Sequence, residues 1–238
     1  MIDRFAGRVA ERYDGDGETD RHGAVSPVVD FLEPLAVGGA LELGIGTGRI
    51  ALPLAARGVR VEGIDLSPDM VAQLRRKPGS EDIPVTIGDF SKTTVDGRFS
   101  LVYLVFNTIM NLTSQDAQVA CFQNAAAHLE PGGRFVIEVG VPDLQRLPRG
   151  EVFRPFDVSP RHLGIDEYDV LNQGLISHHY SIDGERVETV SMPFRYVWPA
   201  ELDLMARLAG MRLTERWAGW GREPFTAESD SHVSVWTL

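Results

Sequence analysis

The sequence predicts an α/β protein built on a doubly wound, seven-stranded sheet whose last two strands form an antiparallel pair. Between residues 39 and 141, apolar β-branched runs alternate with helix-like segments, which is typical of a parallel sheet covered by helices on both faces. After Pro142 the chain alternates in strand fashion around a turn at Asp183 and Gly184, which predicts an antiparallel β insertion after the fifth strand. Only a loop joins the last two apolar runs, so they can pair only antiparallel.

The strands of the parallel core alternate with helices along the chain. The segments expected as strands are 40–45, 59–65, 83–90, 98–107 and 134–141, and those expected as helices are 48–58, 66–77 and 114–133. The second helix has the clearest start, because Ser67 can cap its first amides and Pro68 suits the first helical position. The third is expected to end at Pro131 and the glycines beside it.

The chain is expected to divide into four parts. They are an N-terminal helical cap over 1–38, a ligand-binding α/β core over 39–142, an antiparallel insertion or lid over 143–197, and a C-terminal helix with the final strand pair over 198–238. The last helix is expected to start near Pro199 and to end at Gly210, after which the strand pair completes the core.

Composition excludes several classes of function. The formal charge is −11, from 23 basic and 34 acidic residues, and this charge repels phosphate backbones, so no nucleic-acid partner is expected. No stretch approaches the roughly 18 apolar residues of a membrane span, and the charged N-terminus is unlike a signal peptide. A cytoplasmic protein without a membrane partner is therefore expected, as a monomer or a homodimer. Cys121 is the only cysteine, which excludes an internal disulfide, and no metal site is expected.

The stretch Leu41 to Arg49, LELGIGTGR, joins the first strand to the first helix and has glycines at alternate positions. Such a loop places backbone amides at the carboxyl edge of the sheet, where doubly wound folds bind their ligands. The dinucleotide fingerprint requires its third glycine at position 49, which is occupied by Arg49. This spacing argues against a nicotinamide dinucleotide.

Three carboxylates lie within or at the end of successive strands. Asp65 ends the second strand, where a carboxylate can accept both hydroxyls of a ribose. Asp89 ends the third strand and can accept a proton from an adenine amino group, with Phe90 or Leu66 against the ring. Glu42 lies inside the first strand, where burial without a partner is costly. Because no basic residue for phosphates accompanies them, the set favours a nucleoside ligand that lacks phosphates.

Four motifs, LELGIGTGR, VEGIDLSPDM, VTIGDF and HLEPGGRFVIE, resemble in order and spacing the class I S-adenosylmethionine-dependent methyltransferases, which have a Rossmann-like fold. The resemblance covers nearly the whole chain and implies S-adenosylmethionine as the cofactor. It also implies the residues around that cofactor: Gly44, Gly46 and Gly48 along the methionine portion, Glu42 supporting the loop, Asp65 at the ribose, Leu66 and Met70 beside the adenine, Asp89 and Phe90 recognising it, and Val105 and Phe106 facing the transferable methyl.

Within that family the chain most resembles the small bacterial enzymes that N-methylate amino sugars carried on a nucleotide. The N-terminal ERYDGD, the stretch VYLVFNTIMNL at the fourth strand and the insertion after the fifth strand carry this likeness. The resemblance implies that Tyr13 lies over the cofactor. It also implies a small-molecule acceptor, methylated on nitrogen or oxygen.

The acceptor has to be positioned and, if it is an amine, kept unprotonated by a carboxylate or a neutral histidine. The candidate catalytic residues are Tyr13, His22, Asn107, Glu138, His178 and His179. Several have a structural alternative. Asn107 can stabilise a turn, and Glu138 can bond a neighbour within the sheet. Of two consecutive histidines on a strand, only one can face the site.

Two other functions stay open at this point. A protein that binds the adenosyl cofactor without transferring a methyl would need the same pocket, because methyl transfer requires no indispensable catalytic side chain. A nicotinamide oxidoreductase on a related sheet is disfavoured by Arg49 and by the antiparallel last pair. Calorimetry with the adenosyl compound and with NAD separates the oxidoreductase, which would bind NAD, from the methyltransferase and the binding-only protein, which would bind the adenosyl compound.

Overall fold

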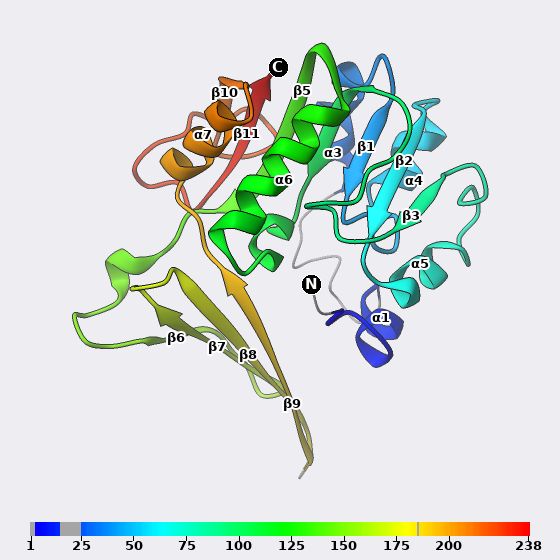
Figure 1. The fold of residues 1–238 in the computed structure, drawn as a ribbon. Helices are drawn as coiled ribbons and strands as arrows, with labels where there is room; N and C mark the ends of the chain where they lie inside the picture. The colour runs from blue at the N-terminus through cyan, green and yellow to red at the C-terminus, as the bar shows by residue number, and fades with distance from the viewer. Residues whose placement is uncertain (1–2, 15–24, 185) are drawn as a thin grey trace.

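The computed structural model describes residues 3–14, 25–184 and 186–238, which form two sheets and their covering helices (Figure 1). The α-helices are α1 (Arg8–Arg12), α3 (Val25–Leu32), α4 (Ala51–Ala56), α5 (Pro68–Leu74), α6 (Gln115–His128) and α7 (Pro199–Leu208). Short 3-10 turns are η1 (Glu33–Leu35), η2 (Thr108–Asn111) and η3 (Leu144–Arg146). The strands are β1 (Ala40–Leu43), β2 (Val61–Asp65), β3 (Val85–Ile87), β4 (Phe99–Leu104), β5 (Leu129–Gly140), β6 (Phe153–Val158), β7 (His162–Asp169), β8 (Gly174–Asp183), β9 (Arg186–Arg195), β10 (Arg212–Trp217) and β11 (Ser231–Thr237). Within these ranges no helix has the length and apolarity needed to span a membrane.

The larger sheet has seven strands in the order β10-β11-β5-β4-β1-β2-β3. Strands β1 to β5 pair in parallel, whereas β11 runs antiparallel to both β5 and β10. Helices lie on both faces of this sheet (Figure 1). The predicted fold class, including the antiparallel last pair, is confirmed. Because β1, β2 and β3 are parallel, their carboxyl ends lie along one edge of the sheet.

Most helix ends follow the capping signals in the sequence. The Ser67 hydroxyl accepts a hydrogen bond from an amide in the first turn of α5, and Pro68 opens that helix, as predicted. The end of α6 differs, because this helix stops at His128 and does not continue to residue 133. That prediction was wrong because β5 already begins at Leu129, which pairs with Phe99 of β4. Pairing within the sheet overrides the helical pattern there.

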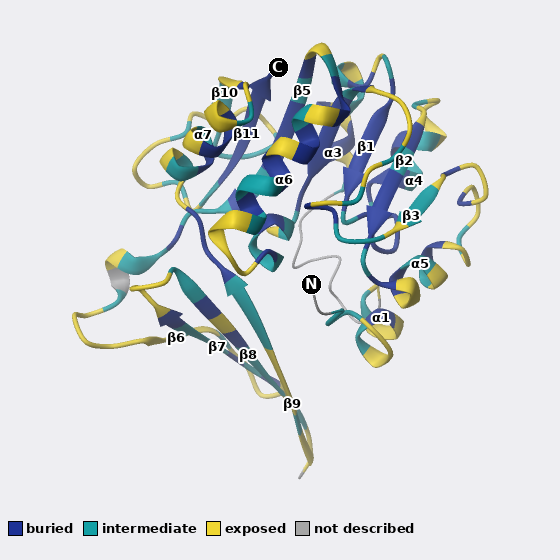
Figure 2. Ribbon diagram, viewed as in Figure 1, coloured by how far each residue is buried: buried dark blue, intermediate teal, exposed yellow. Residues whose placement is uncertain are grey.

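Buried residues concentrate in the larger sheet and its covering helices (Figure 2), and most of them are apolar. Trp236 of β11 lies edge-to-face with Phe122 of α6, at 5.4 Å between ring centroids. Phe122 makes the same kind of contact with Phe135 of β5 at 5.0 Å. Aromatic pairs favour this arrangement because ring edges and faces carry opposite partial charges. Cys121 is buried in the same cluster, and burial raises the pKa of its thiol, which keeps it an inert apolar side chain.

The chain between β5 and α7 forms a second sheet of four antiparallel strands in the order β6-β7-β8-β9, which we call the insertion sheet. It projects away from the larger sheet (Figure 1). Asp183 pairs with Arg186 across the β8–β9 turn, so the predicted antiparallel insertion and its hairpin are confirmed. The sequence does not predict β6 and β7 individually, because three prolines interrupt the alternation of apolar and polar residues before β7.

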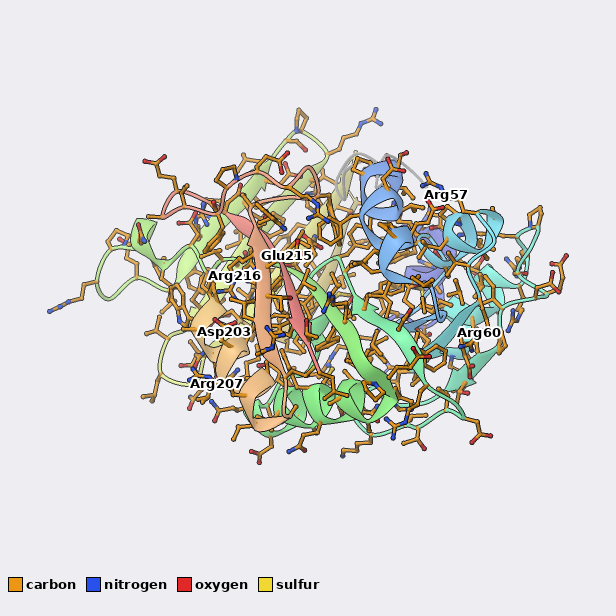
Figure 3. The ribbon with its side chains drawn as sticks, turned by 90° about the horizontal axis from the view of Figure 1, so that it is seen from above. Arg57, Arg60, Asp203, Arg207, Glu215 and Arg216 are labelled. Carbon is orange, nitrogen blue, oxygen red and sulfur yellow. The ribbon has the colours of Figure 1, made fainter. Side chains whose placement is uncertain are left out.

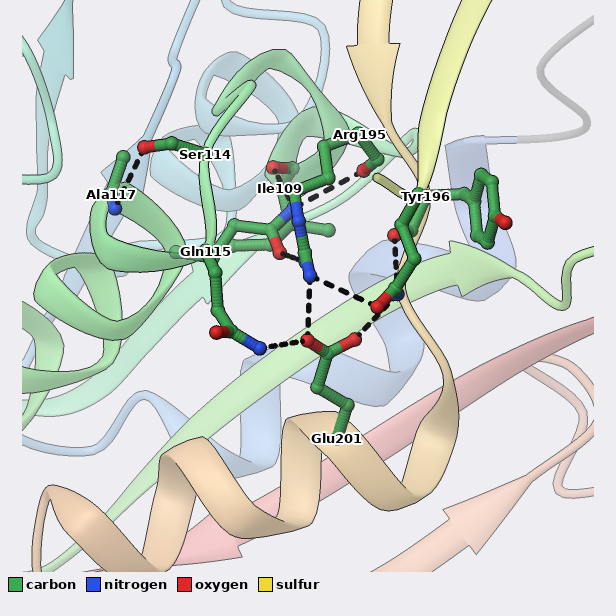
Figure 4. A network of polar contacts seen from close by, with 9 residues as sticks. Ile109, Ser114, Gln115, Ala117, Arg195, Tyr196 and Glu201 are labelled. Carbon is green, nitrogen blue, oxygen red and sulfur yellow. Dashed lines mark hydrogen bonds and ion pairs between the residues drawn. The ribbon is translucent and has the colours of Figure 1, made fainter. Parts of the chain in front are cut away.

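A buried polar network fixes the base of the insertion sheet to the core (Figure 4). Arg195, at the end of β9, is 5% exposed, and its guanidinium donates to Glu201 Oε1 of α7 at 2.8 Å. The same group donates to the side-chain oxygens of Gln118 and Gln173. Gln118 in turn donates to the carbonyl oxygens of Arg195 and Ile109. Since Ile109 belongs to η2, the network ties β9, α6, α7 and η2 together.

A second ion pair holds α7 against the final strand pair (Figure 3). The Arg216 guanidinium of β10 makes two contacts to the Asp203 carboxylate of α7, at 2.7 and 3.2 Å. The indole N–H of Trp236 donates to the same carboxylate at 3.0 Å. Bidentate pairing of arginine with a carboxylate fixes both groups in direction as well as distance. The pair therefore joins α7 to β10, and the Trp236 indole joins it to β11.

Candidate functional site

A pocket lies at the carboxyl edge of β1 and β2, between the glycine loop, η2 and residues 3–14, which we call the N-terminal arm. Its lining residues are Asp3, Arg4, Phe5 and Tyr13 from the arm, Gly44 and Gly46 from the loop, Asp65, Leu66, Ser67, Met70 and Phe90 beyond β2 and β3, and Thr108 and Asn111 from η2. The structure thus brings together most of the residues that the sequence predicts around a cofactor. The predicted residues outside this lining are Glu42, Gly48, Asp89, Val105 and Phe106.

The glycine loop passes close to the pocket walls. Gly44 and Gly46 have φ values of 78° and 53°, a region that favours glycine. A Cβ at Gly44 would lie 2.8 Å from Cγ2 of Thr108, and one at Gly46 would lie 3.2 Å from Cε of Met70. Because Thr108 and Met70 both line the pocket, any side chain at these two glycines would crowd its walls. The absence of side chains here leaves room for a ligand against the loop backbone.

Asp65 connects the loop to the second strand. Its Oδ2 accepts a hydrogen bond from the Gly46 amide at 2.6 Å, and its Oδ1 accepts one from the Ser67 amide at 2.8 Å. The residue is 8% exposed, and burial raises its pKa while these amide hydrogen bonds oppose the rise. Each carboxylate oxygen has a second lone pair, so Asp65 can accept from a ligand while it holds the loop.

Glu42 lies beneath the loop rather than on the pocket wall. It is 4% exposed, and the Tyr103 hydroxyl donates to its Oε2 at 2.9 Å. Burial raises its pKa to about 8, although hydrogen bonds from Tyr103 and from the Ala51 amide oppose the rise. The group is thus mainly uncharged at neutral pH. Because Ala51 begins α4, Glu42 joins β1 to the helix that follows the loop.

The third strand end presents an aromatic ring and an ionised carboxylate. Phe90 is 4% exposed and lines the pocket with Leu66 and Met70. Asp89 Oδ1 accepts hydrogen bonds from the Ser91 amide at 2.9 Å and the Ser91 hydroxyl at 2.7 Å. Burial acts to raise the pKa of Asp89, but the hydrogen bonds from Ser91 outweigh it and the pKa lies below its ordinary value.

The N-terminal arm folds over the glycine loop. Asp14 accepts from the Thr47 hydroxyl at 2.8 Å and forms an ion pair with Lys77 at 2.6 Å. Lys77 also donates to the Thr47 carbonyl at 2.7 Å. These contacts place Tyr13 at the pocket, where its ring lies edge-on to Phe5 at 6.1 Å between centroids. The arm is therefore attached to the loop that it covers.

A strained turn after β4 directs η2 into the pocket. Phe106 and Asn107 both have positive φ, at 57° and 60°. Glu138 Oε2 accepts from the Phe106 amide at 2.5 Å, and Asn107 Oδ1 accepts from the Gly140 amide at 2.7 Å. Burial raises the pKa of Glu138, and the amide hydrogen bonds oppose this. In this structure Asn107 stabilises the turn and Glu138 hydrogen-bonds the neighbouring Phe106 amide, and these were the structural alternatives for the two residues.

The histidine candidates lie away from the pocket lining. His178 and His179 point to opposite faces of the insertion sheet, as their adjacency predicts. His178 contacts Glu167 at 3.0 Å and Ser191 at 2.8 Å, whereas His179 contacts His162 at 3.1 Å. His22 lies outside the described residues. Of the candidate catalytic residues within them, Tyr13 is the one in the pocket lining.

Several pocket residues were not predicted from the sequence. They are Asp3, Arg4, Phe5, Ser67, Thr108 and Asn111. The arm residues have no fixed spacing from the loop, so no pattern could have marked them. The η2 residues follow the fourth strand directly in NTIMN, and the position of that segment at a strand end was a usable signal.

The lining fits an adenosyl cofactor. The glycine backbone leaves space, Asp65 offers acceptor lone pairs for hydroxyls, and Phe90 offers a ring face. Among the residues that the structure describes, no group of His, Cys, Asp and Glu could hold a metal ion.

A broader and more open depression lies at the opposite edge of the sheet, near Arg57 and Arg60 (Figure 3). The Arg57 guanidinium already contacts Asp30 and Glu33, each at 2.7 Å. Arg60 donates to the Gly38 carbonyl at 2.8 Å. Since both arginines are engaged and the amino ends of parallel strands carry no ligand site in such folds, this depression is not the functional site.

Known proteins share this fold and parts of this sequence. Residues 40–133 match the family described as a methyltransferase domain. The chain is similar to the solved CcbJ methyltransferase from Streptomyces caelestis, with 35% identity and a TM-score of 0.83 over 96% of this chain and 95% of that one. It is 28% identical over 198 residues to a cypemycin N-terminal methyltransferase from a Streptomyces species, covering 82% of this chain and 81% of that protein. It is 32% identical over 140 residues to the dTDP-3-amino-3,6-dideoxy-alpha-D-glucopyranose N,N-dimethyltransferase of Streptomyces fradiae, covering 56% of this chain and 54% of that protein.

Proposed function

This chain belongs to the class I S-adenosylmethionine-dependent methyltransferases, and we propose that its methyl acceptor is the amine of a small molecule. It uses S-adenosylmethionine as its cofactor. Membership of this family argues against the nicotinamide oxidoreductase that the sequence left open.

In the proposal, the pocket residues hold the cofactor as the sequence predicts. Asp65 accepts from the ribose hydroxyls while it keeps its hydrogen bond to the Gly46 amide. Phe90 packs on the adenine, with Leu66 and Met70 beside it, and the glycine loop follows the methionine portion. Tyr13 and the rest of the arm cover the cofactor and exclude water. We also keep the predictions that Asp89 recognises the adenine and that Val105 and Phe106 face the transferable methyl.

The bound cofactor supplies a methyl group already activated by the positive sulfur. The protein therefore has to position the acceptor in line with that methyl and to leave the nitrogen lone pair free. Phe106 and Asn107 both have positive φ, a strained backbone conformation that is common at active sites. The turn that they form directs η2 toward the place where the acceptor would meet the methyl group. Thr108 and Asn111 then bound the space where an acceptor meets the cofactor.

One observation carries the proposal of an amine acceptor. On the face of the insertion sheet that lies toward the arm, Asp157 contacts His162 and Glu188 contacts arginines, while Asp166 lies beside Arg154 and Ser177. A carboxylate can take a proton from an ammonium group, whereas a hydroxyl acceptor needs a stronger base, so Asp166 on this face favours an amine acceptor. The names of the cypemycin and amino-sugar relatives likewise specify amine acceptors.

The test is a methylation assay with matched acceptors. The purified protein is incubated with S-adenosylmethionine and a panel of amino-sugar nucleotides and short peptides with a free N-terminus, each paired with its hydroxyl analogue. We expect products that carry an added methyl from amines and none from the hydroxyl partners. Methylation confined to hydroxyl groups would contradict the amine proposal. Cofactor binding by calorimetry without any methyl transfer would instead favour the binding-only alternative.

A further inference from the structure

Five polar side chains form a continuous row across one face of the insertion sheet. Asp157 Oδ2 of β6 lies 2.7 Å from Nδ1 of His162 on β7, and His162 Nε2 lies 3.1 Å from Nδ1 of His179 on β8. His179 Nε2 lies 3.3 Å from the Ser177 hydroxyl. Ser177 is the cross-strand neighbour of Asp166 on β7, and its hydroxyl acts to lower the pKa of that carboxyl. We call these five residues the polar row.

The polar row lies on the face of the insertion sheet that is turned toward the cofactor pocket. On that face Tyr168 and Leu175 belong, with Tyr196, to an apolar cluster against which Met110 of η2 packs, and η2 supplies part of the pocket lining. Also on that face, Glu188 of β9 contacts Arg12 of α1 at 3.4 Å. His162 and Asp166 lie an even number of residues from Tyr168 along β7, and Ser177 and His179 lie an even number of residues from Leu175 along β8. Side chains spaced in this way along a strand share a face.

Burial changes along the polar row. Ser177 and His162 are 7% and 9% exposed, while the Asp157 side chain at the end of the row is 35% exposed. Buried polar groups are costly unless they are hydrogen-bonded, and His162, His179 and Ser177 each have a hydrogen-bond partner within the row. The row is thus a connected path from Asp166, on the side of η2, to solvent at Asp157.

Two hydrogen-bond arrangements with the same number of protons fit these contacts, because each histidine nitrogen can donate or accept. In the first, Asp166 is protonated and donates to Ser177, which donates to His179. His179 then donates to His162, which donates to Asp157. In the second, Ser177 donates to Asp166, His179 donates to Ser177, and His162 donates to His179 as well as to Asp157. Asp166 is then ionised, and His162 carries a second proton. A proton that arrives at Asp166 can therefore emerge beside Asp157 without movement of any heavy atom.

We propose that the polar row is a proton path in which Asp166 accepts a proton from the ammonium form of the methyl acceptor and the row passes it to Asp157 and solvent. This inference rests on the proposed amine methylation. An N–H bond of the acceptor breaks and an O–H bond forms at Asp166. The freed nitrogen lone pair then forms the new N–C bond, while the sulfur keeps the electron pair of the broken S–C bond. Asp166 is the catalytic residue of this path, and the other four members are positioning residues.

The charged groups around Asp166 suit this role. Arg154 of β6 is its cross-strand neighbour and forms an ion pair with Asp143, which follows β5. Tyr168 lies on the same strand and the same face as Asp166. His178 of β8 has a weaker electrostatic interaction with the Asp166 carboxyl. Burial raises the pKa of Asp166, while the Ser177 hydroxyl and the charges of Arg154 and His178 oppose the rise. A carboxyl with a raised pKa takes a proton from an ammonium more readily.

The first test compares pH profiles of kcat/KM for Asp166→Asn and wild type, with the amine that wild type methylates most rapidly. At neutral pH we expect the variant to lose about a hundredfold in kcat/KM, the usual size of a general-base contribution. The loss should shrink as pH rises and the free amine becomes abundant without help. Glu167→Gln, on the opposite face of the same strand, is the matched control and should keep the wild-type profile. A constant loss at every pH, or no loss, would overturn the path.

A second variant tests the row without removing Asp166. Ser177→Ala breaks the connection between Asp166 and His179, and it should reduce kcat/KM at neutral pH by about tenfold with recovery at alkaline pH. Histidine-selective 15N spectra supply a readout that needs no acceptor. At mildly alkaline pH, His179 should carry its proton on Nε2 in wild type and on Nδ1 in Asp166→Asn, because the new amide can donate to Ser177. An unchanged tautomer would contradict the path even if both variants are impaired.

Failure of the inference and failure of the proposed function give different results. If wild type methylates amines and the variants keep its pH profile, the path is wrong and amine methylation stands. If wild type methylates hydroxyls only, the proposed function is wrong, and the path falls with it. Cofactor affinity by calorimetry should be unchanged in all three variants, since none of the altered residues lines the cofactor pocket.

Discussion

At the scale of single residues, three carboxylates near the glycine loop are placed in different electrostatic states by their surroundings. Glu42 is buried against Tyr103 with a pKa of about 8, so it supports the loop mainly as an uncharged group. Asp89 is held by the Ser91 amide and hydroxyl, and its pKa is lowered. Asp65 shares its two oxygens between the loop and the start of α5. Each state follows from the balance between burial, which is deepest at Glu42 and least at Asp89, and the hydrogen bonds and charges that oppose it.

Replacement of Asp65 tests the ribose position. For Asp65→Ala we expect the affinity for S-adenosylmethionine to fall at least tenfold, or by about 1.4 kcal/mol, because two charge-assisted hydrogen bonds are lost. Isothermal titration calorimetry measures this directly. Glu62→Ala, in the same strand but outside the pocket lining, is the control and should bind as wild type does. Unchanged affinity in Asp65→Ala would refute the position of the ribose.

The pH dependence of stability tests the state of Glu42. Its folded pKa, about 8, lies above the ordinary value of 4.5, so the folded protein keeps a proton that the unfolded chain releases between these values. The stabilising contribution is therefore complete at low pH, declines through this interval and is lost as pH rises past the folded pKa. Glu42→Gln should remove a decline in the free energy of unfolding of about 1.4 kcal/mol per pH unit.

Urea denaturation across that pH interval measures the slope for Glu42→Gln and wild type. Glu81→Gln, on the exposed surface, is the control and should retain the wild-type slope. If Glu42→Gln kept the same decline as wild type, the carboxyl would be ionised in the folded protein and the assignment of its state would be wrong.

At the scale of elements, the insertion sheet is attached to the core by polar as well as apolar contacts. Arg195 is the centre of the polar network, and Tyr168, Leu175 and Met110 form the apolar contact beside it. Both sets of contacts include residues of η2, which also lines the cofactor pocket. The element that bounds the cofactor therefore also carries the sheet with the proposed proton path.

Replacement of Arg195 tests this attachment. Arg195→Met keeps much of the side-chain length but leaves the partly buried Glu201 carboxylate without its cation, so the free energy of unfolding should fall by about 3 kcal/mol. Hydrogen bonds from Arg195, Gln173 and Gln115 outweigh burial and lower the pKa of Glu201. The wild-type contribution of Glu201 should then be lost as pH falls through that lowered pKa.

Urea denaturation measures the effect, with Arg207→Met as control, because Arg207 is an exposed arginine near the end of α7 (Figure 3). The control should change the free energy of unfolding by less than about 0.5 kcal/mol. Equal effects in the two variants would mean that the buried network contributes nothing specific to the attachment.

At the scale of the whole molecule, the arm and the insertion sheet approach one another from the two ends of the core. The cofactor-binding edge lies between them, and Glu188 joins them through Arg8 and Arg12. These arginine side chains are 73% and 66% exposed, so water and salt screen the pairs strongly. Loss of this contact would therefore cost little free energy.

Glu188→Gln tests how weak that contact is. We expect the free energy of unfolding to change by less than about 1 kcal/mol, since exposed ion pairs contribute little. Hydrogen exchange in α1 should accelerate, because the helix loses its link to β9. Urea denaturation and exchange mass spectrometry measure the two effects. A large loss of stability would show that the arm and the insertion sheet form one rigid unit.

Much of the fold could be predicted from local pattern. The strands of the larger sheet are runs of β-branched residues, the glycines at 44, 46 and 48 mark the loop, and Ser67 with Pro68 marks the start of α5. These signals act over a few neighbouring residues. The end of α6 was mispredicted because Leu129 pairs with β4, whose pairing residue Phe99 lies far back along the chain.

Local pattern was enough to establish the succession of strands and helices, the glycine loop and the carboxylates at the strand ends, because periodicity and backbone preference are properties of neighbouring residues. The folded chain was needed to show that the arm lies over the pocket, that Asn107 and Glu138 stabilise a turn, and that His162 meets His179. Those contacts depend on the register between strands and on hydrogen bonds between residues distant in sequence, such as Asp14 with Lys77. The register of a hairpin such as β8–β9 follows from its turn, but register and packing between segments distant in sequence are settled only when the whole chain is compact.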